Sequence, residues 1–167
     1  MFPAISRTYA PIGMTPTITV STEINARLYM ASAVSPQEDL LYAIRNKPFD
    51  SKAITEWLEY LRASMGRKLL IIWDGASIHD PQEIRAWLEL QNAGDFLLVK
   101  QPHYSPELNA DEQVWSQLKG GKLKNRCNQN VKELLPRIKI GMQEMQKDKA
   151  LIMSFFKHPK LGYNYTS

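Results

Sequence analysis

Leu69-Leu70-Ile71-Ile72-Trp73-Asp74-Gly75 is the stretch of the chain that decides the fold class. Five consecutive apolar residues are typical of a strand covered on both faces, as strands are in the sheets of α/β proteins. The run ends abruptly at Asp74, and in open α/β sheets ligands bind beyond the carboxyl ends of the strands. The stretch therefore predicts a buried strand with a carboxylate at the edge where sites form. A plain Asp-Gly turn after a strand is the competing interpretation.

The segments on either side of this strand predict alternating helices and strands. Apolar and β-branched runs predict strands over residues 17–20, 27–34, 40–45 and 96–99. Helical spacing of apolar residues predicts helices over residues 51–64, 81–91, 109–118, 130–147 and 149–157. Asp50 or Ser51 and Asn109 are expected to cap two of these helices, and Pro81 is tolerated in a first turn. The order predicts one layered α/β domain over residues 1–167.

The composition excludes several classes of protein. With 44% hydrophobic and 23% charged residues, the chain is neither a disordered nor a membrane protein by composition. The longest apolar runs are too short to span a bilayer, and the first residues do not have the pattern of a signal peptide. One cysteine, Cys127, allows no internal disulfide and fits a reducing cytoplasm. His79, His103 and His158 are the only histidines, so no Cys/His zinc cluster is expected.

A basic segment suggests a nucleic-acid partner. The net charge of +4 permits such a partner without requiring one. Residues 119–126 carry four cations and no acid, namely Lys119, Lys122, Lys124 and Arg126. These cations can neutralise backbone phosphates, or they can form a solvated helix end that favours positive charge. The segment alone leaves both interpretations open.

Glu112 is a second candidate acid, in the first turn of the helix predicted to begin after Asn109. An acid is favoured there by the helix dipole in any case, and the neighbouring Asp111 could serve that purpose equally well. The surroundings of Asp74 and Glu112 make a stronger signal than either residue alone. Residues 69–79 read LLIIWDGASIH and residues 101–115 read QPHYSPELNADEQVW, with 37 residues (112 − 74 − 1) between the two acids.

These two motifs, in this order and at this separation, resemble those of the DDE transposases of bacterial insertion sequences in the mariner superfamily. That family carries Asp-Gly-Ala-x-x-His after a strand and, later, Pro-x-Tyr-Ser-Pro-x-Leu-Asn-Pro-x-Glu-x-x-Trp. The chain matches both, except that Ala110 stands where the family usually has proline. The segment Arg7-Thr8-Tyr9-Ala10-Pro11-Ile12-Gly13 extends the resemblance toward the N-terminus.

The resemblance implies a ribonuclease H-like fold, a mixed sheet flanked by helices. It also implies a DNA-cutting and DNA-joining enzyme whose three carboxylates bind two Mg²⁺ (or Mn²⁺) ions. By matching motifs, Asp74 is the second acid and Glu112 the third. Carboxylate oxygens suit Mg²⁺, and a metal pair can clamp the attacking and leaving oxygens of phosphate displacement. The implied partners are DNA, as transposon ends and target, and a second copy or a full-length transposase. The implied location is the bacterial cytoplasm, at the nucleoid.

The chain departs from the family at the first acid. In the family this aspartate lies on the central first strand, upstream of the segment that Arg7 begins here, and no residue before Arg7 is acidic. We therefore expect a chain that lacks the first central strand and the N-terminal helix-turn-helix region. Glu23, Asp39 and Asp50 are not expected to replace the acid, because none follows the carboxyl end of a predicted strand. Impaired cleavage is the expectation, and a catalytically inactive DNA-binding or inhibitory fragment is the alternative.

Several further residues have both a functional and a structural interpretation. His79 can touch phosphate or a metal-bound water, or it can be a loop or helix-cap residue. Tyr104 and Ser105 can bind DNA phosphates, or they can brace the loop before Glu112. Trp115 is interpreted as core packing that orients its helix. An unrelated α/β hydrolase is a third possibility, but the sequence has no Gly-x-Ser-x-Gly elbow or phosphate-binding loop.

Overall fold

The computed structural model describes residues 27–73, 81–91, 94–102, 108–121 and 131–157. The strand predicted over residues 17–20 lies outside them. The chain divides into two compact units, which we call the hairpin unit (residues 1–47 and 110–157) and the βαβ unit (residues 48–109 and 158–167). Helices and strands are mixed in both units, and the described residues of each unit contain a small two-stranded sheet. No helix in the described segments is long and apolar enough to cross a membrane.

The hairpin unit is built on two antiparallel strands, β1 (Tyr29–Val34) and β2 (Leu40–Arg45), which confirms both predicted strands. The turn between them is closed by Ser35 and Asp39. The backbone N–H of Ser35 donates to the carbonyl of Asp39 at 2.9 Å, and the Ser35 hydroxyl donates to the Asp39 carboxylate at 2.7 Å. Glu38 takes the left-handed conformation there, with φ of 67°. These local bonds fix the register of the hairpin, because the turn geometry sets which residues face each other.

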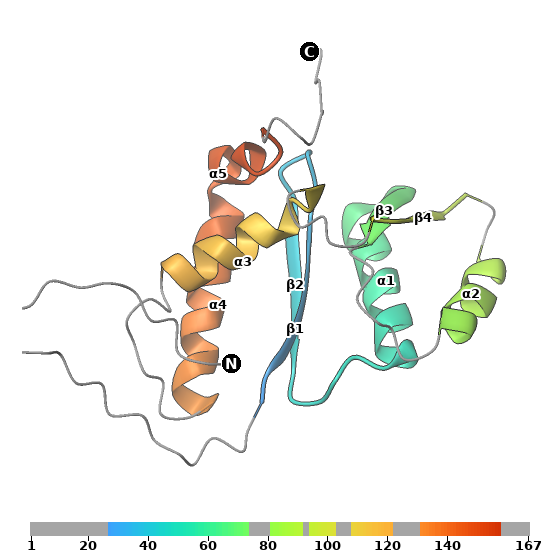
Figure 1. The fold of residues 1–167 in the computed structure, drawn as a ribbon, viewed down its shortest axis with the longest axis horizontal. Coiled ribbons are helices and arrows are strands. Elements are labelled where there is room, and N and C mark those ends of the chain that lie inside the picture. The colour runs from blue at the N-terminus through green and yellow to red at the C-terminus, as the bar shows by residue number, and fades with distance from the viewer. Residues whose placement is uncertain (1–26, 74–80, 92–93, 103–107, 122–130, 158–167) are drawn as a thin grey trace, which may run out of the picture. The chain divides into compact units, whose positions relative to one another are not determined.

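Helices α3 (Asp111–Gly120) and α4 (Val131–Lys147) pack on this hairpin, and α5 (Lys149–Ser154) packs on α4; all three were predicted for this part of the chain. Helix α3 contacts β1, and α4 contacts β2 (Figure 1). The Gln146 side chain donates to the carbonyl of Leu40 at 2.7 Å, so α4 is bonded to the strand it covers. The buried apolar side chains of this unit are Leu40, Ala110, Val114, Leu118, Ile138, Met142, Met145, Ile152, Phe155 and Phe156. They form the core that fixes α3 against the hairpin.

Two details of these helices depart from the usual helical pattern. Ala110, not the predicted Asn109, occupies the N-cap position of α3, and it makes no side-chain cap hydrogen bond. The prediction of Asn109 as the cap is wrong because Ala110 has helical angles, φ −60° and ψ −27°, without the extended geometry of an ordinary cap. Helix α4 contains Pro136, which has no N–H and so cannot donate to the carbonyl of Lys132.

The βαβ unit contains α1 (Ser51–Met65), β3 (Leu69–Trp73), α2 (Pro81–Glu89) and β4 (Phe96–Lys100). Strands β3 and β4 are parallel, with Leu69 opposite Phe96 and Trp73 opposite Lys100. This confirms the predicted alternation of strand and helix, since parallel neighbours need a crossover connection. Trp87 of α2 packs against Phe96 with ring centroids 5.3 Å apart, and Arg62 at the end of α1 pairs with Asp95 at 2.8 Å. These contacts place both helices beside the strand pair.

One face of this strand pair is open, which corrects the expectation that β3 is covered on both faces. The alternating residues Leu69, Ile71 and Trp73 are buried or half-buried. The other face carries four exposed aliphatic side chains, Leu70, Ile72, Leu97 and Val99. Leu70 lies opposite Leu97 and Ile72 opposite Val99 in the strand register, so the four share a face. The Trp87–Phe96 contact puts α2 on the covered face only.

The ends of α1 follow from its sequence. The Asp50 carboxylate accepts a hydrogen bond from the backbone N–H of Ala53 at 2.8 Å, which satisfies a donor that the first turn leaves unpaired. Gly66 ends the helix in the left-handed conformation, with φ of 62°, and its N–H donates to the carbonyl of Arg62. Glycine is suited to that position because it has no Cβ to clash. The predicted helix over residues 51–64, with Asp50 as its cap, is thus confirmed.

Replacing Asp50 with alanine is expected to lower the free energy of unfolding by about 1 kcal/mol, because the Ala53 N–H loses its acceptor. Asp50→Ser keeps a short side-chain oxygen and should retain most of the stability. Urea unfolding followed by circular dichroism measures the change. Equal midpoints for the alanine, serine and wild-type proteins would show that the cap contributes nothing.

Candidate active site on helix α3

The first turn of α3 contains two neighbouring acids with different environments. Glu112 is exposed to solvent, whereas Asp111 is half-buried. Successive residues of an α-helix are rotated by about 100° around its axis, so the two side chains leave the helix in different directions. Both acids favour the positive end of the helix dipole, but only Glu112 leaves its carboxylate open to a ligand.

Asp111 joins α3 to the hairpin. The Ser32 hydroxyl, on β1, donates to Oδ2 of Asp111 at 2.7 Å, and the indole Nε1 of Trp115 donates to the same oxygen at 2.9 Å. Bonds to an ionised carboxylate are about twice as strong as bonds between neutral groups. The three side chains, which we call the Asp111 network, fix the first turn of α3 to β1. Trp115 is half-buried and bonds to Asp111 through its N–H; its interpretation as core packing that orients the helix stays a prediction.

Asp74 directly follows β3 in the sequence and lies outside the described residues. The last residue of this strand, Trp73, pairs with Lys100 of β4. The carbonyl of Trp73 accepts from the N–H of Gln101 at 2.8 Å. Strand β3 thus ends one residue before Asp74 in the sequence, and the position of Asp74 itself stays a prediction. That its carboxylate meets that of Glu112 stays a prediction.

The comparison with known families assigns the chain. The family model described as DDE superfamily endonuclease matches residues 3–135, which include β1 to β4, α1 to α3 and both candidate acids. The chain is a member of the DDE superfamily endonuclease family. No curated protein matches the chain. Endonuclease domains of this family act on DNA and generally use divalent metal ions, so the family implies a nuclease or transposase type of activity.

Glu112 has the chemistry that a divalent cation of the endonuclease family requires. Mg²⁺ is a hard cation that prefers carboxylate oxygens, and an exposed carboxylate can bind it while leaving room for water and phosphate. Among the residues that the structure describes, no three His, Cys, Asp or Glu side chains gather into a metal-binding cluster. That Glu112 is one of several acids of a metal site, as the family motif implies, stays a prediction.

The predicted DNA-binding residues of this endonuclease domain are divided between the described and the undescribed parts of the chain. Lys119 is exposed in the last turn of α3, where a cation also favours the helix dipole. The other members of the predicted set lie outside the described residues: His79, Tyr104, Ser105, Lys122, Lys124 and Arg126. Their roles stay predictions.

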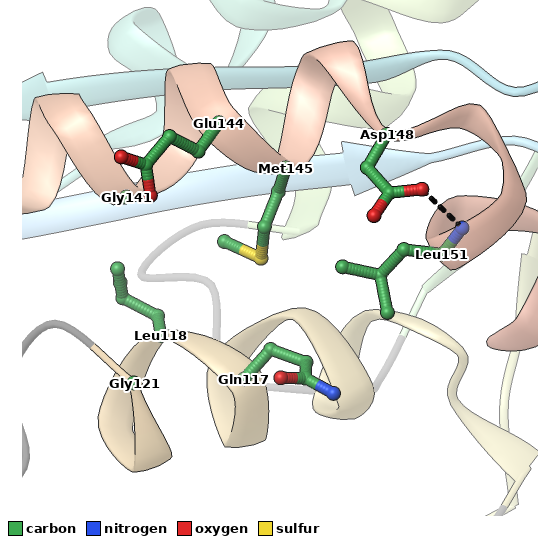
Figure 2. A pocket seen from close by; sticks show the side chains of 8 residues that line it. All are labelled: Gln117, Leu118, Gly121, Gly141, Glu144, Met145, Asp148 and Leu151. Atoms are coloured by element: carbon green, nitrogen blue, oxygen red, sulfur yellow. Dashed lines mark hydrogen bonds between the residues drawn. The ribbon is translucent and has the colours of Figure 1, made fainter.

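A groove of about 340 Å³ lies farther along α3, where it faces α4 and the start of α5 (Figure 2). Leu118, Met145 and Leu151 point into it, and Asp148 beside them accepts from the N–H of Leu151 at 2.9 Å. Its remaining lining residues are Gln117, Gly121, Gly141 and Glu144. Gln117 is five residues beyond Glu112, roughly 8 Å along the helix axis. The groove therefore belongs to the helix packing and is separate from the first turn that carries the acids.

The Asp111 network is the part of the candidate site that the sequence did not predict. Asp111 and Trp115 are four residues apart, a spacing that brings side chains together on a helix. The sequence therefore indicated the contact between these two residues. Ser32 had none, because it is 79 residues away from Asp111 in the sequence and lies inside an ordinary strand. The motif match singled out Glu112 and not Asp111 as the third acid, and the structure shows Glu112 exposed; its role as a ligand stays a prediction.

Proposed function

We propose that this chain is the catalytic domain of a DDE transposase of the mariner superfamily from a bacterial insertion sequence, acting on DNA in the cytoplasm. It would cut DNA at transposon ends and join those ends to a target. The observation that carries this proposal is the division of roles in the first turn of α3. Asp111 is bonded to Ser32 and Trp115, while the neighbouring Glu112, at the motif position of the third acid, is exposed.

In this proposal Asp74 and Glu112 hold the divalent metal. Two Mg²⁺ or Mn²⁺ ions, when bound, supply positive charge to the attacking and leaving oxygens of a phosphate displacement. The protein needs no covalent nucleophile for such a step. The exposure of Glu112 supports its assignment, since a ligand shared with DNA phosphate must be reachable from solvent.

DNA is held in this proposal by cations and polar groups near the acids. Lys119, Lys122, Lys124 and Arg126 would neutralise backbone phosphates, and His79, Tyr104 and Ser105 would hydrogen-bond to them. Binding through phosphates is independent of sequence and weakens as salt rises. The partner protein would be a second copy of the chain or a full-length transposase, because transposon ends are processed in pairs.

A second candidate function is DNA binding or inhibition without cutting. It is favoured by the number of catalytic acids that the motifs supply. The motifs supply two of the three expected acids within residues 1–167. Of the possible replacements, Asp39 accepts from the Ser35 hydroxyl and Asp50 caps α1, so each already has a structural role. Glu23 lies outside the described residues. With two acids, the metal pair would be held weakly and cleavage would be slow.

Nicking of supercoiled plasmid by the purified chain tests both functions. We expect slow nicking in Mn²⁺ that EDTA stops and that Asp74→Asn removes, because Asn keeps the side-chain shape and loses the charge that holds a cation. The control is Glu133→Gln, which likewise replaces a carboxylate with an amide, at an acid in the first turn of α4. It should nick at the wild-type rate.

Each result of the nicking assay assigns one function. Equal nicking by the wild-type and Asp74→Asn proteins would overturn the metal-dependent nuclease. Salt-sensitive binding of DNA without any nicking would replace it with the second function.

A further inference from the structure

We propose that Asp111 and Ser32 are positioning residues for Glu112: their hydrogen bond fixes the first turn of α3 on β1 and thereby aims the Glu112 carboxylate at the metal. The inference rests on the proposed function, because it needs Glu112 as a metal ligand. It goes beyond that function by giving a task to two residues outside the family motif positions.

The hydrogen bonds of Asp111 hold helix α3 in one orientation. Oδ2 of Asp111 accepts from two donors on different elements, the Ser32 hydroxyl of β1 at 2.7 Å and the Trp115 indole of α3 at 2.9 Å. A single oxygen with two donors at such distances fixes both the position and the direction of the carboxylate. Both bonds are partly shielded from solvent, where hydrogen bonds to a charged group are stronger.

The first turn of α3 needs such an anchor. Its N-cap, Ala110, makes no side-chain cap bond, and a helix end without a side-chain cap is prone to fraying. Asp111 is the first residue of the helix and Glu112 the second, so the anchor acts on the residue next to the proposed ligand. Because successive residues are rotated by about 100°, holding Asp111 toward β1 sets the direction of Glu112 toward solvent.

Metal binding by Glu112 depends on the orientation of this first turn. Ligand groups must be held within about 0.5 Å of the productive geometry, and the residues that orient a ligand typically change metal affinity 10- to 100-fold when they are lost. Asp111 is not itself assigned as a ligand, because Oδ2 accepts from Ser32 and Trp115 and Oδ1 is buried away from solvent. Its carboxylate is an acceptor within the fold, and the neighbouring carboxylate is the accessible one.

Mn²⁺ affinity of the full chain, measured by electron paramagnetic resonance of the free ion, tests the inference. Ser32→Ala and Asp111→Ala are each expected to weaken Mn²⁺ binding about 10-fold or more. Ser32→Thr keeps the hydroxyl and Asp111→Asn keeps an acceptor oxygen, so both should restore affinity to within about threefold of the wild type. Ser116→Ala, at an exposed serine of the same helix, is the matched control and should leave affinity unchanged.

Two further measurements separate positioning from general stability. Thermal unfolding identifies any variant that is not folded at the temperature of the titration. If Asp111→Ala fails to fold, Trp115→Phe, which keeps an aromatic ring, although a smaller one, and loses the N–H donor, replaces it. A merely structural bond would lower the melting temperature without changing the Mn²⁺ affinity of the folded protein, and that result would overturn the inference.

Glu112→Gln distinguishes failure of the inference from failure of the proposed function. If Glu112→Gln weakens Mn²⁺ binding and the Ser32→Ala and Asp111→Ala proteins bind as the wild type does, the positioning role is overturned and the proposed function stands. If Glu112→Gln binds Mn²⁺ as the wild type does, or the wild type binds none, the proposed metal site fails and the inference fails with it.

Discussion

Glu112→Gln is expected to lower the rate of Mn²⁺-dependent plasmid nicking at least about 100-fold, the loss typical when one electrostatic stabiliser is taken from an active site. Glutamine has nearly the same size and shape, so the change removes the charge and replaces one acceptor oxygen with an NH₂ donor. The neutral amide holds a divalent cation poorly, because hard cations prefer carboxylate oxygens. Initial rates over a range of Mn²⁺ concentrations measure the effect.

The same substitution should change stability very little. Glu112 is exposed, and an acid in the first turn of a helix contributes only about 0.3–1 kcal/mol through the helix dipole. Urea unfolding of Glu112→Gln should therefore stay within about 1 kcal/mol of the wild type. A large loss of stability together with the loss of nicking would mean that Glu112 supports the fold, contrary to the site proposed here.

Leu58→Ala is expected to destabilise the protein by about 2–5 kcal/mol, since a buried leucine loses its transfer free energy and leaves a cavity. Leu58 is 1% exposed and lies on the buried face of α1 with Ile54 and Leu61. Domains of this size are stable by about 5–15 kcal/mol, so the change removes a large share of the total. Urea unfolding followed by tryptophan fluorescence measures it, with Trp57 on the same helix as a local reporter.

Leu90→Ala is the matched control for Leu58. Leu90 follows α2 in the same unit and is 84% exposed, so the same chemical change there should alter stability by less than about 0.5 kcal/mol. Equal losses at the two positions would contradict the placement of the core on the inner face of α1.

Local sequence signals predicted most of the elements of this fold. The spacing of Ile54, Trp57 and Leu58 predicted α1, and Asp50 and Gly66 marked its ends, because capping depends on residues within one turn. The apolar run of Leu69 to Trp73 predicted β3, but its coverage on both faces was wrong. A run of apolar residues shows that a strand avoids water and does not say which elements lie on each side.

The candidate site was less predictable than the fold. Glu112 was singled out by motif and by its place on a helix; the structure adds that it is exposed, and its catalytic role stays a prediction. The bond from Ser32 to Asp111 joins residues far apart in the sequence, and neither residue type nor spacing predicts such a contact. The convergence of Asp74 with Glu112, and the roles of His79, Tyr104 and Ser105, stay predictions.

Pro136 makes the N-terminal end of α4 locally less stable than its C-terminal end. The turn before it, residues 131–135, is tied to the rest of the helix by one backbone link fewer, while the following part carries the buried Ile138, Met142 and Met145. Local unwinding of α4 therefore begins at its first turn and stops at Pro136, because further unwinding would expose the core. The part of the helix that carries Ile138, Met142 and Met145 stays packed on the hairpin while that first turn unwinds.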